Sequence, residues 1–309
     1  MDSSARYFSY CIRQAREYFA AAEDVTILTR PLLLFYGMVC LAKTLILLKE
    51  PDYPTLIGEQ GNKRLHGLSY RDHATDSTLV EEDEVTIQSA GTFADLYRTY
   101  KEELPGNRSY TLRDLMGWIP ELYPQIAKYD RFKMRLASGN SDIISWEGKV
   151  RANLHIFNAK DFPDGTLFNL YPFLQEHFEA SEANPGIQFM GRSEQATRER
   201  TLDRTRETVA VKELEKFLSR YCRYSYFTVM YLLPDKEQLQ FTPLLASYML
   251  MYGLSRVCRY MPDKWGRVVE ARESNERWLL ERYVQFASKT FPWEVYQVYA
   301  GKPVLLTSQ

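Results

Sequence analysis

Two almost uninterrupted apolar stretches, residues 32–49 and 244–260, constrain this chain more than any other feature. Each follows a proline, Pro31 or Pro243, and proline is favoured in the first turn of a helix because no hydrogen bond needs its missing N–H there. A helix that is apolar on nearly all sides is either a membrane span or the centre of a large core. Because Lys43 interrupts the first stretch and the mean hydropathy of the chain is −0.39, we expect two core helices that pack against each other.

A glycine lies inside each stretch, Gly37 in the first and Gly253 in the second. Glycine within a helix costs about 1 kcal/mol relative to alanine. The two positions therefore indicate two places where the backbone of another helix comes close.

Helical spacing recurs along most of the chain. Apolar side chains at steps of three and four residues predict a first helix over residues 4–23. Residues 50–84 have the composition of a loop, and residues 85–88 that of a short strand. The fold class is therefore expected to be mainly α. Further helices are expected at 92–103, 111–128 (broken near Pro120 and Pro124), 209–231, 263–272 and 274–289.

The middle of the chain, from about residue 141 to 192, has a different pattern. Apolar and polar residues alternate from Val150 to Phe157, which is the period of a half-buried strand, and residues 187–190 could pair with it. No clear linker separates this part from the rest. We therefore expect a single domain over residues 1–309, with a mixed α/β insert at about 141–192.

Charge and cysteine content exclude several classes of protein. The chain has 39 basic and 40 acidic residues, a balance that argues against wholesale coating of nucleic acid but leaves a local basic strip possible. Its four cysteines form no CxxC pair, so we expect reduced, buried thiols. The N-terminus lacks the basic-then-apolar layout of a signal peptide, which favours a cytoplasmic location.

No familiar catalytic, metal or cofactor motif is present. The four histidines form no HExxH, and the glycine-rich loops that cradle phosphates are missing, as is the G-x-S-x-G elbow. No Arg and His have the spacing that helical nucleases require. The sequence therefore predicts no catalytic residues, no metal site and no cofactor.

Arginine and tyrosine mingle in two short segments, residues 220–226 and 256–260. Together they could clamp a phosphate and stack a base. The alternative is a helix rim of long amphipathic side chains, which needs no ligand.

Several segments resemble those of YaaC-like bacterial proteins. In the N-terminal half these are AREYFAAAE at 15–23, RPLLLFYGM at 30–38, LAK at 41–43 and HGLS at 66–69. In the C-terminal half the segment YGLSRVCRYMPDKW at 252–265 resembles the family's Leu-Ser-x-x-x-Arg-Tyr-x-Pro-x-x-Trp stretch. The helical core of that family is similar to the HEPN superfamily, so the resemblance implies a HEPN-like helical bundle. It also implies a module encoded beside effectors, including sirtuin-type NAD-consuming enzymes, in anti-phage operons.

The resemblance and the missing catalytic spacing lead to one functional expectation. The chain is expected to be a non-catalytic accessory subunit that binds an effector from the same operon, such as a sirtuin-type NADase, and helps to sense a nucleotide. It is expected to act in a homo- or hetero-oligomer and not in a membrane. The ligand site is expected at Lys43, Arg64, His66, Arg256 and Arg259.

Two alternatives remain open from the sequence. One is a metal-independent ribonuclease that uses His66 with Arg64 or Arg71. The other is a housekeeping module that binds nucleotides or RNA.

Overall fold

In the structure, a computed structural model, the chain forms two compact units. Unit 1 comprises Met1–Met116 with Phe241–Tyr299, and unit 2 comprises Gly117–Gln240 with Ala300–Gln309. The prediction of a single domain stays a prediction. The residues that the structure describes are 3–53, 66–73, 79–101, 103–126, 133–146, 149–163, 165–183, 186–191, 197–198, 204–227, 229–234, 240–271 and 274–301.

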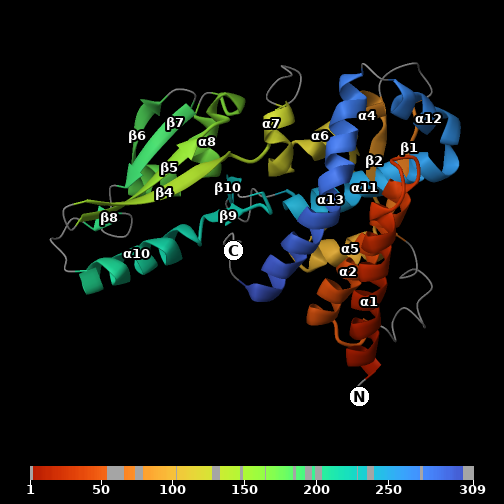
Figure 1. Ribbon diagram of the computed structural model, residues 1–309, viewed down its shortest axis with the longest axis horizontal. Coiled ribbons are helices and arrows are strands. Elements are labelled where there is room, and N and C mark those ends of the chain that lie inside the picture. The colour runs from red at the N-terminus through yellow and green to blue at the C-terminus, as the bar shows by residue number, and fades with distance from the viewer. Residues whose placement is uncertain are drawn as a thin grey trace. The chain divides into compact units, whose positions relative to one another are not determined.

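Unit 1 is mainly helical, as the sequence predicts. The helices α1 and α2 lie side by side (Figure 1), and α2 also packs along α11. The helices and their bounds are α1 (Ser3–Glu23), α2 (Arg30–Lys49), α4 (Leu79–Glu82), α5 (Thr92–Arg98), α6 (Leu112–Met116), α11 (Pro243–Tyr260), α12 (Pro262–Glu270) and α13 (Asn275–Ala300).

The two apolar helices pack against each other, which confirms that expectation. The Phe35 ring of α2 lies 5.4 Å from the Tyr248 ring and 5.5 Å from the Tyr252 ring of α11, both edge-on. By length and hydropathy α2 could cross a membrane, but 72% of its most apolar window is buried within the protein. It therefore serves as a core helix.

The helix glycines have a different cause from the one expected. A Cβ atom on Gly37 would lie 3.1 Å from the Phe19 ring, and one on Gly253 would lie 2.9 Å from a methyl group of Leu112. Side chains from α1 and α6 thus fill both places. The expectation that another helix backbone comes close there was wrong.

A small antiparallel sheet completes unit 1. Its strands are β1 (Leu68–Arg71), β2 (Glu84–Ile87) and β3 (Ser109–Thr111), in the order β1-β2-β3. Only β2 was predicted. The strands β1 and β3 have four and three residues, and β1 lies within residues 50–84, whose composition predicted a loop.

Unit 2 is built on a larger sheet, in the order β6-β7-β5-β4-β10-β9, with β8 beside β5. Its strands are β4 (Ser138–Trp146), β5 (Lys149–Ile156), β6 (Phe178–Ala183), β7 (Gly186–Gly191), β8 (Thr197–Arg198), β9 (Cys222–Tyr224) and β10 (Met230–Leu232). The predicted pairing is confirmed, because β7 runs antiparallel to β5 with Ile156 opposite Ile187. The sheet reaches beyond residues 141–192, the bounds expected for the insert.

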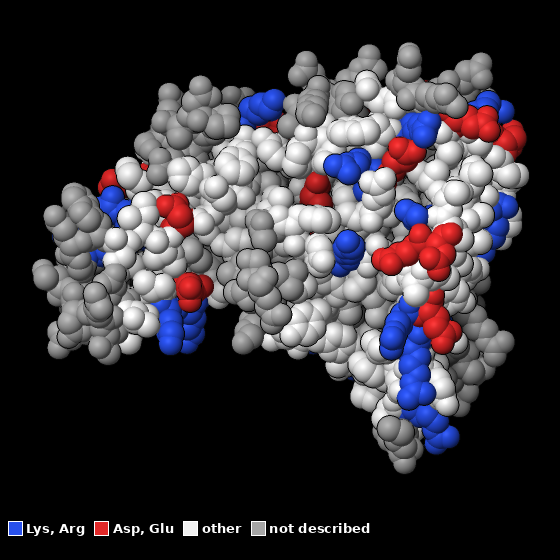
Figure 2. Space-filling view, in the orientation of Figure 1, with Lys and Arg blue, Asp and Glu red and all other residues white. Residues whose placement is uncertain are grey.

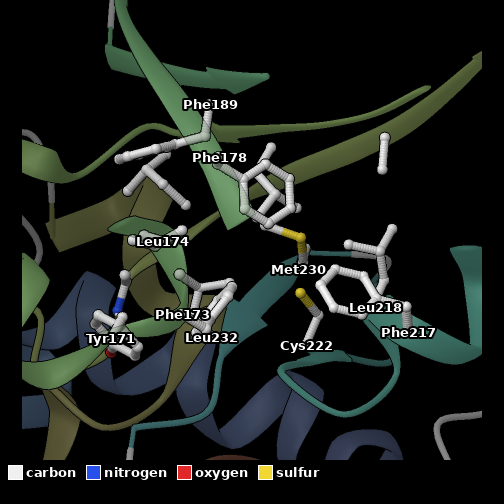
Figure 3. Packing of buried hydrophobic residues seen from close by; sticks show 14 of the residues in the cluster. Tyr171, Phe173, Leu174, Phe178, Phe189, Phe217, Leu218, Cys222, Met230 and Leu232 are labelled. Carbon is white, nitrogen blue, oxygen red and sulfur yellow. The ribbon is translucent and has the colours of Figure 1, made fainter. Parts of the chain in front are cut away.

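The core of unit 2 lies on one face of this sheet, where Figure 3 shows Phe173, Phe178 and Phe217 close together. The alternating residues Val150, Ala152, Leu154 and Ile156 of β5 are all fully buried there. Side chains from the helices cover them, and the Phe173 ring stacks on the Tyr221 ring at 4.1 Å. The helices of unit 2 are η2 (Pro120–Leu122), α7 (Tyr123–Ile126), η3 (Ala159–Asp161), α8 (Thr166–Leu170), α9 (Phe173–His177) and α10 (Arg204–Leu218).

Several predicted helices have other bounds. The helix expected at 92–103 ends as α5 at Arg98, and the one expected at 111–128 is divided into α6, η2 and α7. The helix expected at 209–231 ends as α10 at Leu218, and the chain then enters β9 and β10, because Cys222 and Met230 are buried in the sheet core rather than on a helix face. The helix expected to end at 289 instead runs to Ala300 through Pro292. Buried residues on both sides of that proline, Phe291 and Trp293, hold the helix together there.

Candidate functional site

Four of the five residues expected to bind a ligand meet in unit 1. Lys43 comes from α2, Arg256 and Arg259 come from the C-terminal part of α11, and His66 directly precedes the turn into β1. All three cations influence the titration of the His66 imidazole. We call these four residues the cationic cluster. The fifth residue, Arg64, lies outside the described residues.

Backbone hydrogen bonds fix the segment that carries His66. The carbonyl of His66 accepts a hydrogen bond of 2.9 Å from the Phe93 N–H at the start of α5. Gly67 follows with φ of +78°, a conformation that favours glycine, and Tyr252 of α11 donates to the Leu68 carbonyl at 2.8 Å. The segment is therefore tied to both α5 and α11, beside the apolar helix pair.

The His66 ring is half-buried between aromatic side chains. It lies 5.1 Å from the Phe35 ring and 6.0 Å from the Tyr252 ring. Burial lowers the pKa of His66 below its usual 6.5, and the positive charges of Arg259, Lys43 and Arg256 lower it further. The imidazole is therefore neutral at pH 7, in a region of positive potential.

The two guanidinium groups are held in place by tyrosines. Arg259 donates a hydrogen bond of 2.8 Å from a terminal nitrogen to the Tyr36 hydroxyl. The guanidinium carbons of Arg256 and Arg259 lie 4.1 and 4.5 Å from the centre of the Tyr260 ring, within cation–π range. These contacts fix where the two arginine heads lie.

The cluster carries positive charge that the described part of the chain does not balance. No described carboxylate forms an ion pair with Lys43, Arg256 or Arg259. The Nε atoms of Arg256 and Arg259 are also buried without a hydrogen-bond acceptor among these residues. These two Nε atoms are shielded from solvent, as is the Nε of Arg30, so the unpaired charge of the cluster, rather than these donors, indicates a place for an anion.

A structural explanation accounts for only part of the cluster. The end of a helix carries partial negative charge, which stabilises cations in its last turn by about 0.3–1 kcal/mol each. That effect suits Arg259, which lies in the last turn of α11, but not Arg256, which lies before that turn. It does not explain why Lys43 of α2 and the His66 segment meet them.

The second Arg–Tyr segment has a structural role in unit 2. Arg223 donates to the backbone carbonyls of Ser219 and Cys222, and Cys222 is buried in the sheet core. Tyr221 stacks on Phe173. Residues 220–226 therefore have a structural role, but around the strand β9 and not on the rim of a helix.

The sequence reasoning missed the aromatic partners of the cluster. Tyr36 and Tyr252 were read only as part of the apolar helices, yet each lies on the same face as a cluster residue. Lys43 follows Tyr36 by seven residues, and Arg256 follows Tyr252 by four, so both pairs share a helix face. This spacing was the signal that could have found them.

Another gathering of basic side chains lies along the first part of α1 (Figure 2). Arg6, Arg13 and Arg16 are all exposed there, and Glu17 and Glu23 follow on the same helix. In the described part of the chain, no hydrogen bond or ion pair links these three arginines to a second element. This line of charge has the character of a solvated helix face.

Thiols and metal ligands do not form a further site in the described part of the chain. All four cysteines are free; Cys11, Cys40 and Cys222 are buried and Cys258 is partly exposed. Burial raises the pKa of Cys11 to about 11, which keeps this thiol protonated. Among the described residues no group of three His, Cys, Asp or Glu side chains could hold a metal ion.

A family model described as YaaC-like Protein matches residues 3–298. The chain belongs to the YaaC-like family. The matched range contains both helices of the apolar pair and all four residues of the cationic cluster. The cluster therefore lies in the part of this YaaC-like chain that the family model covers. Comparison of the chain with curated proteins and with solved structures gives no match.

Proposed function

We propose that this YaaC-like protein is a non-catalytic subunit that binds a nucleotide-type anion at the cationic cluster. One observation carries the proposal: the guanidinium groups of Arg256 and Arg259 lie together against the Tyr260 ring without an ion-pair partner among the described residues, and they act on His66 together with Lys43. A phosphate group supplies several acceptor oxygens and the missing negative charge, and arginine binds it through two parallel hydrogen bonds.

The non-catalytic part of the proposal rests on what surrounds His66. A general acid or base acts best with a pKa near the working pH, and burial, followed by the neighbouring cations, lowers the pKa of His66 from 6.5 and so away from neutral pH. No described carboxylate faces the imidazole to assist it. Binding without turnover is the simpler use of such a site.

The wider role in the proposal comes from the family resemblance. We propose that unit 1 is a HEPN-like bundle, built around the α1–α2 pair and α11, and that the subunit docks on an effector encoded beside it in an anti-phage system. A sirtuin-type NADase is the partner we favour. Co-expression of the neighbouring gene followed by size-exclusion chromatography tests the docking, and a strict monomer would count against it.

Ligand binding is tested by isothermal titration calorimetry of the full chain with ATP. Arg256→Ala and Arg259→Ala are expected to weaken binding at least tenfold each, because each removes a charged hydrogen-bond donor. Arg267→Ala is the matched control, since this arginine lies in the same unit but is exposed and pairs with Asp263. Equal affinity of all three variants and wild type would refute the proposal, provided that circular dichroism shows folded proteins.

The ribonuclease remains a second candidate, because the fold brings His66 near arginines that are distant in sequence. These are Arg256 and Arg259, whereas Arg71 is exposed and lies 3.8 Å from Glu84. Incubation of the protein with RNA, beside a His66→Ala variant, separates the two functions. Cleavage by wild type alone would favour the ribonuclease over the binding subunit.

A further inference from the structure

We infer that the cationic cluster recognises the phosphate chain of its ligand rather than the base, and that it selects a group with several negative charges. The inference rests on the proposed function and narrows it to one ligand class, the polyphosphates. Nucleoside triphosphates and inorganic polyphosphate share this chemistry.

The charge balance of the cluster sets the number of negative charges. Lys43, Arg256 and Arg259 bring three permanent positive charges to one place, and no described carboxylate pairs with them. A single carboxylate or a phosphodiester would neutralise one charge only. A chain of two or three phosphates matches the full set.

The cations that act on His66 come from two helices, α2 and α11, and two of them lie against one ring, that of Tyr260. Because attraction grows with each added charge and is stronger at a half-buried site than in water, affinity should rise with the number of phosphates.

The aromatic side chains of the cluster are already engaged in protein contacts. The Tyr36 ring stacks on the Tyr18 ring at 5.6 Å, and its hydroxyl accepts from Arg259. The Tyr252 hydroxyl donates to a backbone carbonyl, and the Tyr260 ring lies against both guanidinium groups. These rings position the cations, so they provide no dedicated platform for a base.

Tyr260 therefore acts as a positioning residue for the arginine heads. Its side chain is 55% exposed, so its replacement leaves the core intact. Tyr260→Leu is expected to weaken polyphosphate binding several-fold, because the guanidinium groups lose the ring on which they rest. Tyr260→Phe keeps the ring and is expected to bind polyphosphate as wild type does. If the Tyr260 hydroxyl had a role in binding, Tyr260→Phe would bind more weakly.

The experiment is a calorimetric series on the full wild-type chain with adenosine, AMP, ADP, ATP, GTP and inorganic tripolyphosphate. We expect no binding of adenosine and a gain of about tenfold or more from AMP to ATP. ATP, GTP and tripolyphosphate should agree within about threefold. Arg256→Lys, which keeps the charge but loses the planar fork, should weaken all three alike.

Different failures of this series have different meanings. Binding of adenosine, or of ATP without GTP and tripolyphosphate, would show that the base is read; it would overturn the inference and leave the proposed function intact. Tight binding of a short RNA without tripolyphosphate would overturn the inference in favour of the nuclease. Absence of binding by every compound would remove both the inference and the proposed function.

Discussion

The buried ion pair between Asp83 and Lys264 allows a sharp test of how unit 1 is stabilised. The Asp83 side chain is 1% exposed and its two oxygens accept from the Lys264 ammonium at 2.7 and 2.9 Å. The Tyr70 hydroxyl and the His73 backbone N–H also donate to this carboxylate. Lys264 has a second partner in Asp72. This one carboxylate thus accepts hydrogen bonds from Tyr70, His73 and Lys264.

Removal of this carboxylate by Asp83→Ala is expected to destabilise the protein by about 3 kcal/mol. Breaking a buried pair by removing one partner costs about 3–5 kcal/mol, because the remaining charge stays buried. The lower end applies here, since the Lys264 side chain is 15% exposed and keeps Asp72. The matched control is Asp263→Ala on α12, the helix that also carries Lys264. Asp263 and Arg267 are 75% and 73% exposed, and an exposed ion pair contributes about 0–1 kcal/mol.

The assay is urea unfolding of the full chain, followed by the fluorescence of tryptophans that include the buried Trp265 of α12. Asp83→Asn serves as a second variant, because it keeps the shape but loses the charge. If Asp83→Ala were no more destabilising than Asp263→Ala, the ion pair would not stabilise the unit and the reasoning would fail.

The pH dependence of the same pair has a definite sign. Burial alone would lower the pKa of Lys264, but the hydrogen bonds and charges of Asp72 and Asp83 outweigh burial and raise it above 10.5. The folded state therefore holds this proton more tightly than the unfolded chain does. The stabilisation is complete at neutral pH and is lost as the pH rises through the raised pKa.

Three further outcomes are expected from urea unfolding. Burial raises the pKa of Glu121 to about 7 from 4.5, so the free energy of unfolding falls as the pH rises between these values. Glu121→Gln should therefore be up to about 3 kcal/mol more stable than wild type at pH 8 and lose this advantage near pH 5. A gain in stability that did not depend on pH would contradict this cause. Leu154→Ala, in the core of unit 2, should cost about 2–5 kcal/mol, and a cost below 1 kcal/mol would show that the core collapses around the change. Tyr283→Phe removes hydrogen bonds of 2.7 and 2.9 Å to Ser247 and should cost about 1–3 kcal/mol, whereas no loss would mean that water replaces the hydroxyl.

The long helices and the central strand could be predicted because each has a periodic pattern strong enough to dominate its surroundings. Both apolar helices, their mutual packing and the pairing of β5 with β7 belong to this class. The prediction of a helix was wrong for residues 219–232 because the pattern there is weak. Their aromatic residues fit a helix and a strand equally well, and only the partner strand β4 decides between them.

The candidate site was predictable in its members but not in its geometry. Family-like motifs pointed to Lys43, His66, Arg256 and Arg259, which the fold brings together. The choice of arginine to accompany His66 could not come from sequence spacing, because the partners lie in the other half of the chain. Contacts of this kind depend on tertiary packing, which no local pattern encodes.

The division of unit 1 between two distant segments affects how the protein is made. Helix α2 emerges from the ribosome well before α11, with the Gly117–Gln240 segment of unit 2 synthesised between them. At translation rates of roughly 5–20 residues per second, an apolar helix waits for roughly 10–40 s without the surface that will bury it. The nascent chain is therefore a natural client for chaperones during that interval, and a truncated product would lack half of the cationic cluster.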